Sequence, residues 1–120
     1  MRIAALLIGV AMLSGCRYSY LQSVINTHVG FAHLTRGCGQ NTVDALRQRV
    51  TGDDVPVLVR MLDSRDHVTQ ICAALALETI QPEGLGALQS EFAKMQAGPV
   101  RNWDRYYAVK DALAEAASGR

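Results

Sequence analysis

Apolar residues recur at intervals of three and four along most of the chain, and no segment alternates apolar and polar residues for long enough to predict a strand. The clearest pattern covers residues 53–80. One apolar stripe follows Asp54 and Pro56, polar residues interrupt it at 63–66, and a second stripe begins at Val68. Two helices joined by so short a turn must lie antiparallel, so the pattern predicts a helical hairpin within an all-α fold.

The next segment repeats this plan. A first apolar stripe spans residues 85–95, a break follows at 97–99, and Asn102 stands where it can cap a last helix. Displacing the sequence so that Asp66 falls on Asp104 also superposes apolar positions of the two later helices. This weak internal repeat predicts a second hairpin after the first.

Two more helices are expected upstream of these hairpins. Residues 41–50 carry an apolar stripe that stops near Gly52. Residues 18–34 place Tyr18 and Leu21 on one helical face, which predicts a helix that packs as the first layer of the fold. The alternative is a tether, although flexible linkers are usually rich in Gly, Ser or charge and this segment is rich in apolar residues.

The segment 53–80 resembles a HEAT-like repeat, in which a first helix, a turn containing Asp and a second Ala- and Leu-rich helix recur. The resemblance is carried by residues 57–62, Asp63, Asp66, Val68 and 73–75. It departs from the family at Thr69, where Arg usually stands, and it covers about half of the mature chain. The resemblance implies antiparallel helix hairpins stacked as a short HEAT-like α-solenoid, and it implies nothing about function.

The first residues have the three parts of an export signal. Arg2 is the charged start, residues 3–13 form an apolar run, and small residues follow. The run is too short for a permanent transmembrane helix, which takes roughly 20 residues. The sequence Leu-Ser-Gly-Cys at 13–16 resembles the lipobox of bacterial lipoproteins, which implies cleavage by signal peptidase II and diacylglycerol and palmitate on Cys16. The alternative is an ordinary signal peptide with a chance cysteine.

These patterns predict three parts of the chain. Residues 1–15 form a cleaved signal helix, residues 16–40 a lipidated and helical N-terminal segment, and residues 41–120 the HEAT-like domain. The second residue of the mature chain is Arg17 and not the Asp that commonly retains lipoproteins in the inner membrane. The resemblance therefore favours the outer membrane of the cell envelope, with the domain facing the periplasm.

The charge balance narrows the classes of partner. The chain has 12 Lys and Arg against 11 Asp and Glu, and the predicted cleavage removes one basic residue, so the mature domain is neutral. Binding to nucleic acid or to a broad anionic lipid surface depends on clustered positive charge, which the sequence lacks. The expected contacts are therefore with the membrane through the lipid and with an unidentified protein.

Two further cysteines, Cys38 and Cys72, remain once Cys16 is assigned to lipid. An even pair in an oxidising compartment predicts a disulfide bond. The alternative is a free, buried Cys72 on an apolar helix face and an unrelated Cys38 in a loop, because the sequence does not give the separation of the two Cα atoms.

Residues that could support chemistry are sparse. His28, His33 and His67 form no pair with metal-binding spacing, and no serine lies in a nucleophile motif. We therefore expect no catalytic residues, no metal and no cofactor, and a chain that is not an enzyme.

Paired carboxylates at 53–54, and at Asp63 with Asp66, could bind a cation or act as acid and base. Their places before predicted helices favour N-caps instead.

One aromatic cluster lies near the C-terminus, at Trp103, Tyr106 and Tyr107. The helical spacing of Trp103 and Tyr106 predicts that these two pack into the core. Arg and Tyr are enriched at binding hot spots, which suggests a partner-facing surface. Its candidate residues are Arg60, Arg65, Arg101, Arg105 and Tyr107.

The combined patterns favour a lipid-anchored, periplasm-facing protein–protein interaction module, an envelope scaffold or adaptor. An inhibitor or immunity lipoprotein that neutralises a periplasmic toxin is one alternative, and a purely structural lipoprotein is another. Residues 13–50 are also faintly similar to the start of a family of predicted lipoprotein aminopeptidases. Those enzymes require an HExxH-type motif that this chain lacks, so the similarity would imply a remnant without activity.

Overall fold

The computed structural model describes the backbone of residues 2–29 and 37–118 and the side chains of residues 15–28 and 37–118. Within this part of the chain every regular element is helical, which confirms the predicted all-α class. The elements are α1 (Arg2–Val29), α2 (Gln40–Arg47), the 3₁₀ turn η2 (Gly52–Asp54), α3 (Val55–Met61), α4 (His67–Thr79), α5 (Glu83–Gln96) and α6 (Trp103–Ala117).

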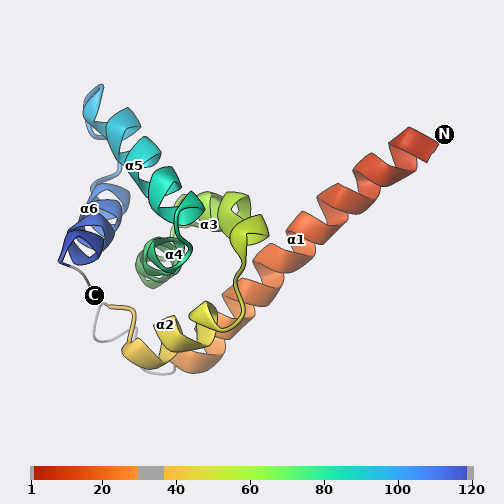
Figure 1. Ribbon diagram of the computed structural model, residues 1–120, viewed down its shortest axis with the longest axis horizontal. Helices are drawn as coiled ribbons and strands as arrows, with labels where there is room; N and C mark the ends of the chain where they lie inside the picture. Colours follow the sequence, from red (N-terminus) through yellow and green to blue (C-terminus); the bar gives the residue numbers. More distant parts are fainter. Residues whose placement is uncertain (1, 30–36, 119–120) are drawn as a thin grey trace.

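Helix α4 is the centre of the fold, and the other five α-helices all pack against it (Figure 1). Five consecutive or near-consecutive side chains of α4 have no exposed surface: Cys72, Ala73, Ala74, Ala76 and Leu77. Three of these are alanines, whose short side chains let neighbouring helices approach the α4 backbone closely. A helix that is apolar on nearly every side is stable only when it is surrounded in this way.

The helices after residue 54 form two hairpins. Helices α3 and α4 pair across the short turn, as the sequence predicts, and α5 pairs with α6. Helix α4 also lies beside α6, and α3 lies beside α5. Each element of one hairpin therefore contacts its counterpart in the other.

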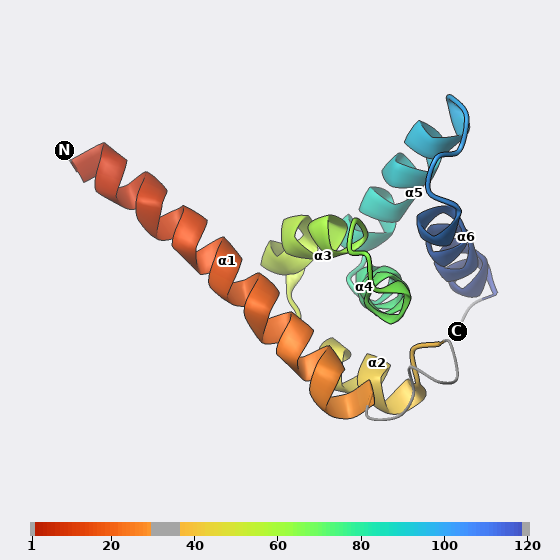
Figure 2. The same cartoon turned by 180° about the vertical axis from the view of Figure 1, so that it is seen from behind.

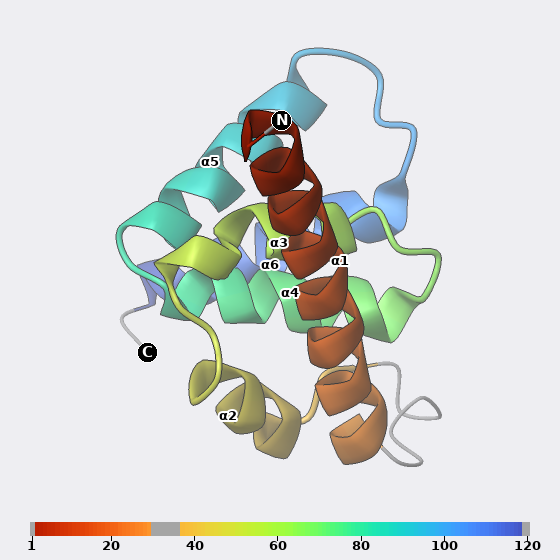
Figure 3. The same ribbon diagram turned by 90° about the vertical axis from the view of Figure 1, so that its right-hand side faces the viewer.

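Helix α1 is a single long helix whose first half projects away from the other helices (Figures 1 and 2). Its second half crosses the domain, as the side view shows (Figure 3), and buries Leu21, Val24 and Ile25. The predicted first-layer helix is thus present as far as Val29, in place of a tether. The remainder of the predicted segment, residues 30–34, lies outside the described residues. Among the residues described, no helix is long and apolar enough to cross a membrane.

The helix starts are capped in different ways. Asn102 accepts a hydrogen bond from the backbone amide of Arg105 at 3.0 Å, so this predicted cap of α6 is confirmed. Asp54 and Asp66 stand at the N-cap positions of α3 and α4, but neither side chain bonds a helix amide there. The carboxylate of Asp66 accepts from the Thr69 hydroxyl at 2.7 Å instead. The simple N-cap interpretation of these two aspartates is therefore wrong.

Cys38 and Cys72 form a disulfide bond, with their Cα atoms 5.2 Å apart. The bond joins the segment before α2 to the middle of α4 and so attaches the upstream part of the domain to its central helix. It closes a loop with a sequence separation of 34, which stabilises the fold by about 3–4 kcal/mol in the chain-entropy account of cross-links.

Gly84 marks the closest approach between the end of α4 and the start of α5. A Cβ atom added there would clash with the carbonyl oxygen of Leu77. Gly84→Ala should therefore lower the free energy of unfolding by about 1–3 kcal/mol through overpacking. Gly86, on the same helix, has open space around it, so Gly86→Ala should stabilise by up to about 1 kcal/mol. Urea unfolding of both variants checks this, and equal effects would contradict it.

Candidate functional site

Cys16, the residue predicted to carry lipid, is exposed on α1. The next residue is held by the domain. The Arg17 guanidinium donates to both carboxylate oxygens of Asp54, through Nε at 3.0 Å and Nη2 at 2.9 Å, and to the Arg49 carbonyl oxygen at 3.1 Å. Such a bidentate pair has fixed geometry as well as charge attraction.

Asp54 is only 4% exposed, and its carboxylate also accepts the backbone amide of Thr51 at 2.9 Å. Burial disfavours a lone carboxylate, so Arg17 supplies the counter-charge that Asp54 needs. Conversely, the hydrogen bond with Asp54 raises the pKa of Arg17. The residue beside the predicted anchor is therefore fixed to the start of α3.

The five predicted partner-facing residues lie in different surroundings. Arg60 is exposed on α3, where its guanidinium stands 5.4 Å from the ring centre of Tyr18 on α1. Arg65 is exposed in the turn between α3 and α4. Arg101 borders a hollow of about 230 Å³ where α5 connects to α6. The structure does not gather these three arginines at one place.

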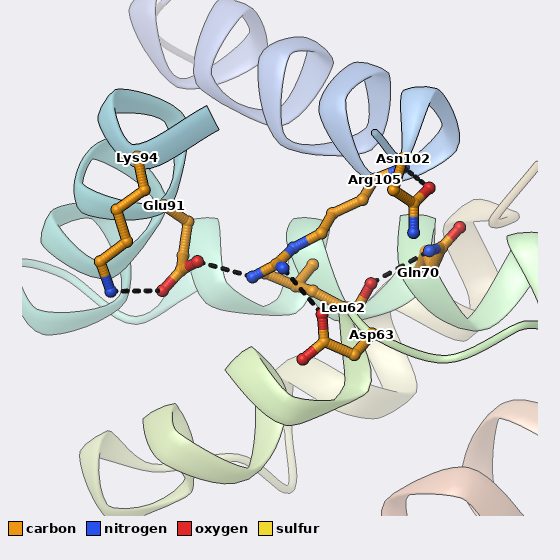
Figure 4. Close-up of polar contacts among 7 residues, drawn as sticks. All are labelled: Leu62, Asp63, Gln70, Glu91, Lys94, Asn102 and Arg105. Atoms are coloured by element: carbon orange, nitrogen blue, oxygen red, sulfur yellow. Dashed lines mark hydrogen bonds and ion pairs between the residues drawn. The ribbon is translucent and has the colours of Figure 1, made fainter. Parts of the chain in front are cut away.

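Arg105 is occupied within the domain (Figure 4). Its guanidinium reaches from α6 to Glu91 on α5 at 2.6 Å and to Asp63 at the end of α3 at 2.7 Å. The side chains of Arg105 and Glu91 are 19% and 13% exposed, so this ion pair is largely shielded from water. Lys94 adds a second cation 3.3 Å from Glu91. The network links α6 to α5 and to the end of α3. Arg105 therefore has a structural role, and its guanidinium is not free to bind a partner.

Replacing Arg105 should therefore destabilise the fold, because Glu91 would keep a partly buried charge without its main partner. We expect Arg105→Ala to lower the free energy of unfolding by about 2–3 kcal/mol, and Arg105→Lys to restore little of it, since an ammonium group cannot bridge both carboxylates in the same plane. Arg101→Ala is the matched control at an exposed position and should change stability by less than about 0.5 kcal/mol. Chemical unfolding followed by circular dichroism measures these free energies. An Arg105→Ala variant as stable as the control would refute the structural role.

Tyr107 belongs to an aromatic cluster on α6 together with Trp103 and Tyr106. Trp103 and Tyr107 stack with ring centres 5.9 Å apart, and Tyr106 meets each of them edge-on at 5.5 and 5.4 Å. Trp103 is 55% exposed and Tyr107 is 50% exposed. The prediction that Trp103 packs into the core is therefore wrong: it begins α6, and more than half of its surface is exposed.

Two neighbouring hollows begin at Tyr107 of this cluster and continue along α4 and α6. One, of about 430 Å³, lies between α4 and α6 and is bordered by Ile71 and Tyr107. The other, of about 310 Å³, lies between α2, α4 and α6 and is bordered by Glu78. Both are bordered by Leu75 and Glu115, so the two hollows adjoin there, and we call them together the α4–α6 groove.

Glu78 is the unusual residue of this groove. It is 8% exposed, and burial raises the pKa of its carboxyl group, with the nearby charge of Glu115 acting in the same direction and Arg47 acting against both. The sequence contains a signal for it: Glu78 lies seven residues after Ile71 and three after Leu75, both helical spacings, so a carboxylate stands in an apolar stripe.

Comparisons with protein-family models, with curated proteins and with solved structures found no match to this chain. Across the described residues, no three His, Cys, Asp or Glu side chains are grouped so that they could hold a metal ion.

The raised pKa of Glu78 gives stability a definite pH dependence. Its carboxyl group contributes most to stability at pH values below 4.5, its ordinary pKa, and this contribution is lost as the pH rises through the raised value in the folded chain. Glu78→Gln should therefore raise the urea midpoint at pH 7 and leave it nearly unchanged at pH 4. The exposed Glu83→Gln is the control. A Glu78→Gln variant that is less stable than the parent at pH 7 would contradict the assigned cause.

Proposed function

We propose that this chain is a lipid-anchored, periplasm-facing protein–protein interaction module, an envelope scaffold or adaptor. In this proposal the signal segment is removed before Cys16, the lipid holds that residue at the outer membrane, and the helical domain presents a binding surface. The single observation that carries the binding role is the exposed stack of Trp103 and Tyr107 on α6.

Exposed aromatic side chains favour this role because of their energetics. Large aromatic residues left in water forgo the stabilisation of burial, and they are the residues most enriched at binding hot spots. Lys110 lies 5.9 Å from the Tyr107 ring centre and 6.0 Å from that of Tyr106, which adds a cation at the edge of the cluster. A partner that covers the cluster would bury two half-exposed rings.

The arrangement of the helices supports the same reading. Helix α1, which carries Cys16, lies on one side of α4, and α6 lies on the other (Figures 1 and 2). Since Arg17 is bound to Asp54, the proposed lipid would be attached one residue away from the folded domain. The aromatic cluster would then stand on the side away from the anchor, accessible to a periplasmic protein.

The hairpin contacts support a HEAT-like stack as the scaffold of this surface. In such a stack equivalent helices of neighbouring repeats lie side by side, as α4 does with α6 and α3 with α5. Thr69, which stands where the family usually has Arg, contacts α1: its hydroxyl accepts a hydrogen bond from the Gln22 side-chain amide at 2.9 Å. We infer that α1 covers the open end of the first repeat.

The anchor is tested by Cys16→Ala with membrane fractionation. The variant should leave the membrane fraction. Its free energy of unfolding should stay within about 0.5 kcal/mol of that of the parent, because an exposed side chain is replaced. A variant that remains quantitatively membrane-bound after full signal cleavage would rule out the lipid anchor.

The binding surface is tested by photocrosslinking in cells, with a photoreactive amino acid at Tyr107 or, as a control, at the exposed Gln89 of α5. Position 107 should give a discrete crosslinked product that mass spectrometry identifies, and the Trp103→Ala change should reduce its yield at least about tenfold, since hot-spot aromatics contribute 2 kcal/mol or more. Equal products from both positions, or none, would argue against the proposed surface. A toxin as the captured protein would select the immunity alternative.

A further inference from the structure

The α4–α6 groove has an apolar floor and carboxylates around it. Ile71 and Leu75 of α4 form part of the floor. The acidic residues that border it come from α4 and α6: Glu78, Asp104, Asp111 and Glu115. The basic groups at its edge are Arg47 of α2 and His67, whose Nδ1 lies 3.8 Å from Asp104. The groove is therefore predominantly acidic, although the predicted mature chain is neutral.

Glu78 is the independent sign that this groove takes a ligand. The residue is more than nine-tenths buried and still borders the hollow. Among the described residues no ion pair involves its carboxylate. The like charge of Glu115 raises the pKa of this group, and the charge of Arg47, which borders the same hollow, lowers it. Buried carboxylates in folded proteins are normally paired. Arg47 faces two carboxylates, Glu78 and Glu115, at this end of the groove, so a bound cation can balance the second charge.

We propose that the α4–α6 groove binds a Lys- or Arg-bearing peptide segment of a partner protein, with Glu78 and Glu115 as the counter-charges for the basic side chain. This inference rests on the proposed function as an interaction module and names the chemistry of the partner. An inorganic cation fits less well, because the described residues hold no cluster of three metal-binding groups.

The groove matches both parts of such a side chain. Lys and Arg have an apolar stem and a charged head. The stem would lie over Leu75 and Ile71, while the head reaches the carboxylates of Glu78 and Glu115. Tyr107 borders the same groove and stacks on Trp103, so residues that flank the basic side chain would meet the exposed aromatic cluster. One partner segment could therefore occupy the groove and cover the cluster.

The test uses the full chain in detergent and three capped pentapeptides, acetyl-Ala-Leu-Xaa-Leu-Ala-amide with Arg, citrulline or Glu at the centre. Citrulline has the shape of Arg without its charge. Titrations followed by amide NMR at low salt should show the Arg peptide shifting the resonances of Leu75, Glu78 and Glu115. Its affinity should exceed that of the citrulline peptide at least about tenfold and decrease as salt is added, as charged hydrogen bonds require. The Glu peptide should not bind.

Two variants make the assignment specific. Glu78→Gln keeps the size of the side chain and removes its charge, and it should weaken binding of the Arg peptide at least about tenfold. Glu83→Gln changes an exposed carboxylate of α5 outside the groove and should leave the affinity unchanged. Equal binding of the Arg and citrulline peptides, equal affinities of the two variants, or no binding at millimolar peptide would each overturn the proposal.

Failure here is distinguishable from failure of the interaction role. If a partner crosslinks from position 107 and Glu78→Gln leaves that yield unchanged, the module function stands and the groove assignment is overturned. If position 107 captures nothing while the Arg peptide binds through Glu78, the groove assignment stands and the aromatic surface is refuted. In the expected result, Glu78→Gln lowers both the peptide affinity and the crosslinking yield.

Discussion

The burial of α4 is the constraint on which the rest of the structure depends. A helix surrounded by five others must satisfy its polar groups within the domain. Gln70 does so by donating to the Leu62 carbonyl oxygen at 3.0 Å, and Thr69 does so through Gln22 and Asp66. The disulfide at Cys72 adds a covalent link on the same helix. Each of these contacts fixes a neighbouring segment in place against α4.

Outside that core, arginines hold the peripheral helices. Arg17 binds Asp54 and so attaches α1 to the start of α3, while Arg105 joins the end of α3, α5 and α6. In both cases one guanidinium reaches two acceptors, which a Lys side chain could not do with the same geometry. A small domain with short helices gains register from such contacts, because apolar packing alone tolerates sliding of one helix along another.

Local patterns in the sequence predict much of this fold and little of its side-chain pairing. Periodicity and capping residues locate the two hairpins and the Asn102 cap, because these depend on neighbours within a few residues. The role of Asp54 could not be predicted, since its partner Arg17 lies far away in the sequence. The exposure of Trp103 was missed for a similar reason: helical spacing indicates which residues share a face but not whether another helix covers it.

Glu78 and the Trp103–Tyr107 stack share one property, which is that each lowers the stability of the isolated domain. Burial of the Glu78 carboxyl group opposes its ionisation, and exposed rings forgo the gain of burial. Proteins usually pair their buried charges and bury their large aromatic side chains. Exceptions concentrate at functional sites, where binding or catalysis is selected over stability. Here Glu78 and Tyr107 of the stack both border the α4–α6 groove. A cationic, partly apolar segment would satisfy both at once, which is why the two features are better explained by one ligand than by two separate defects.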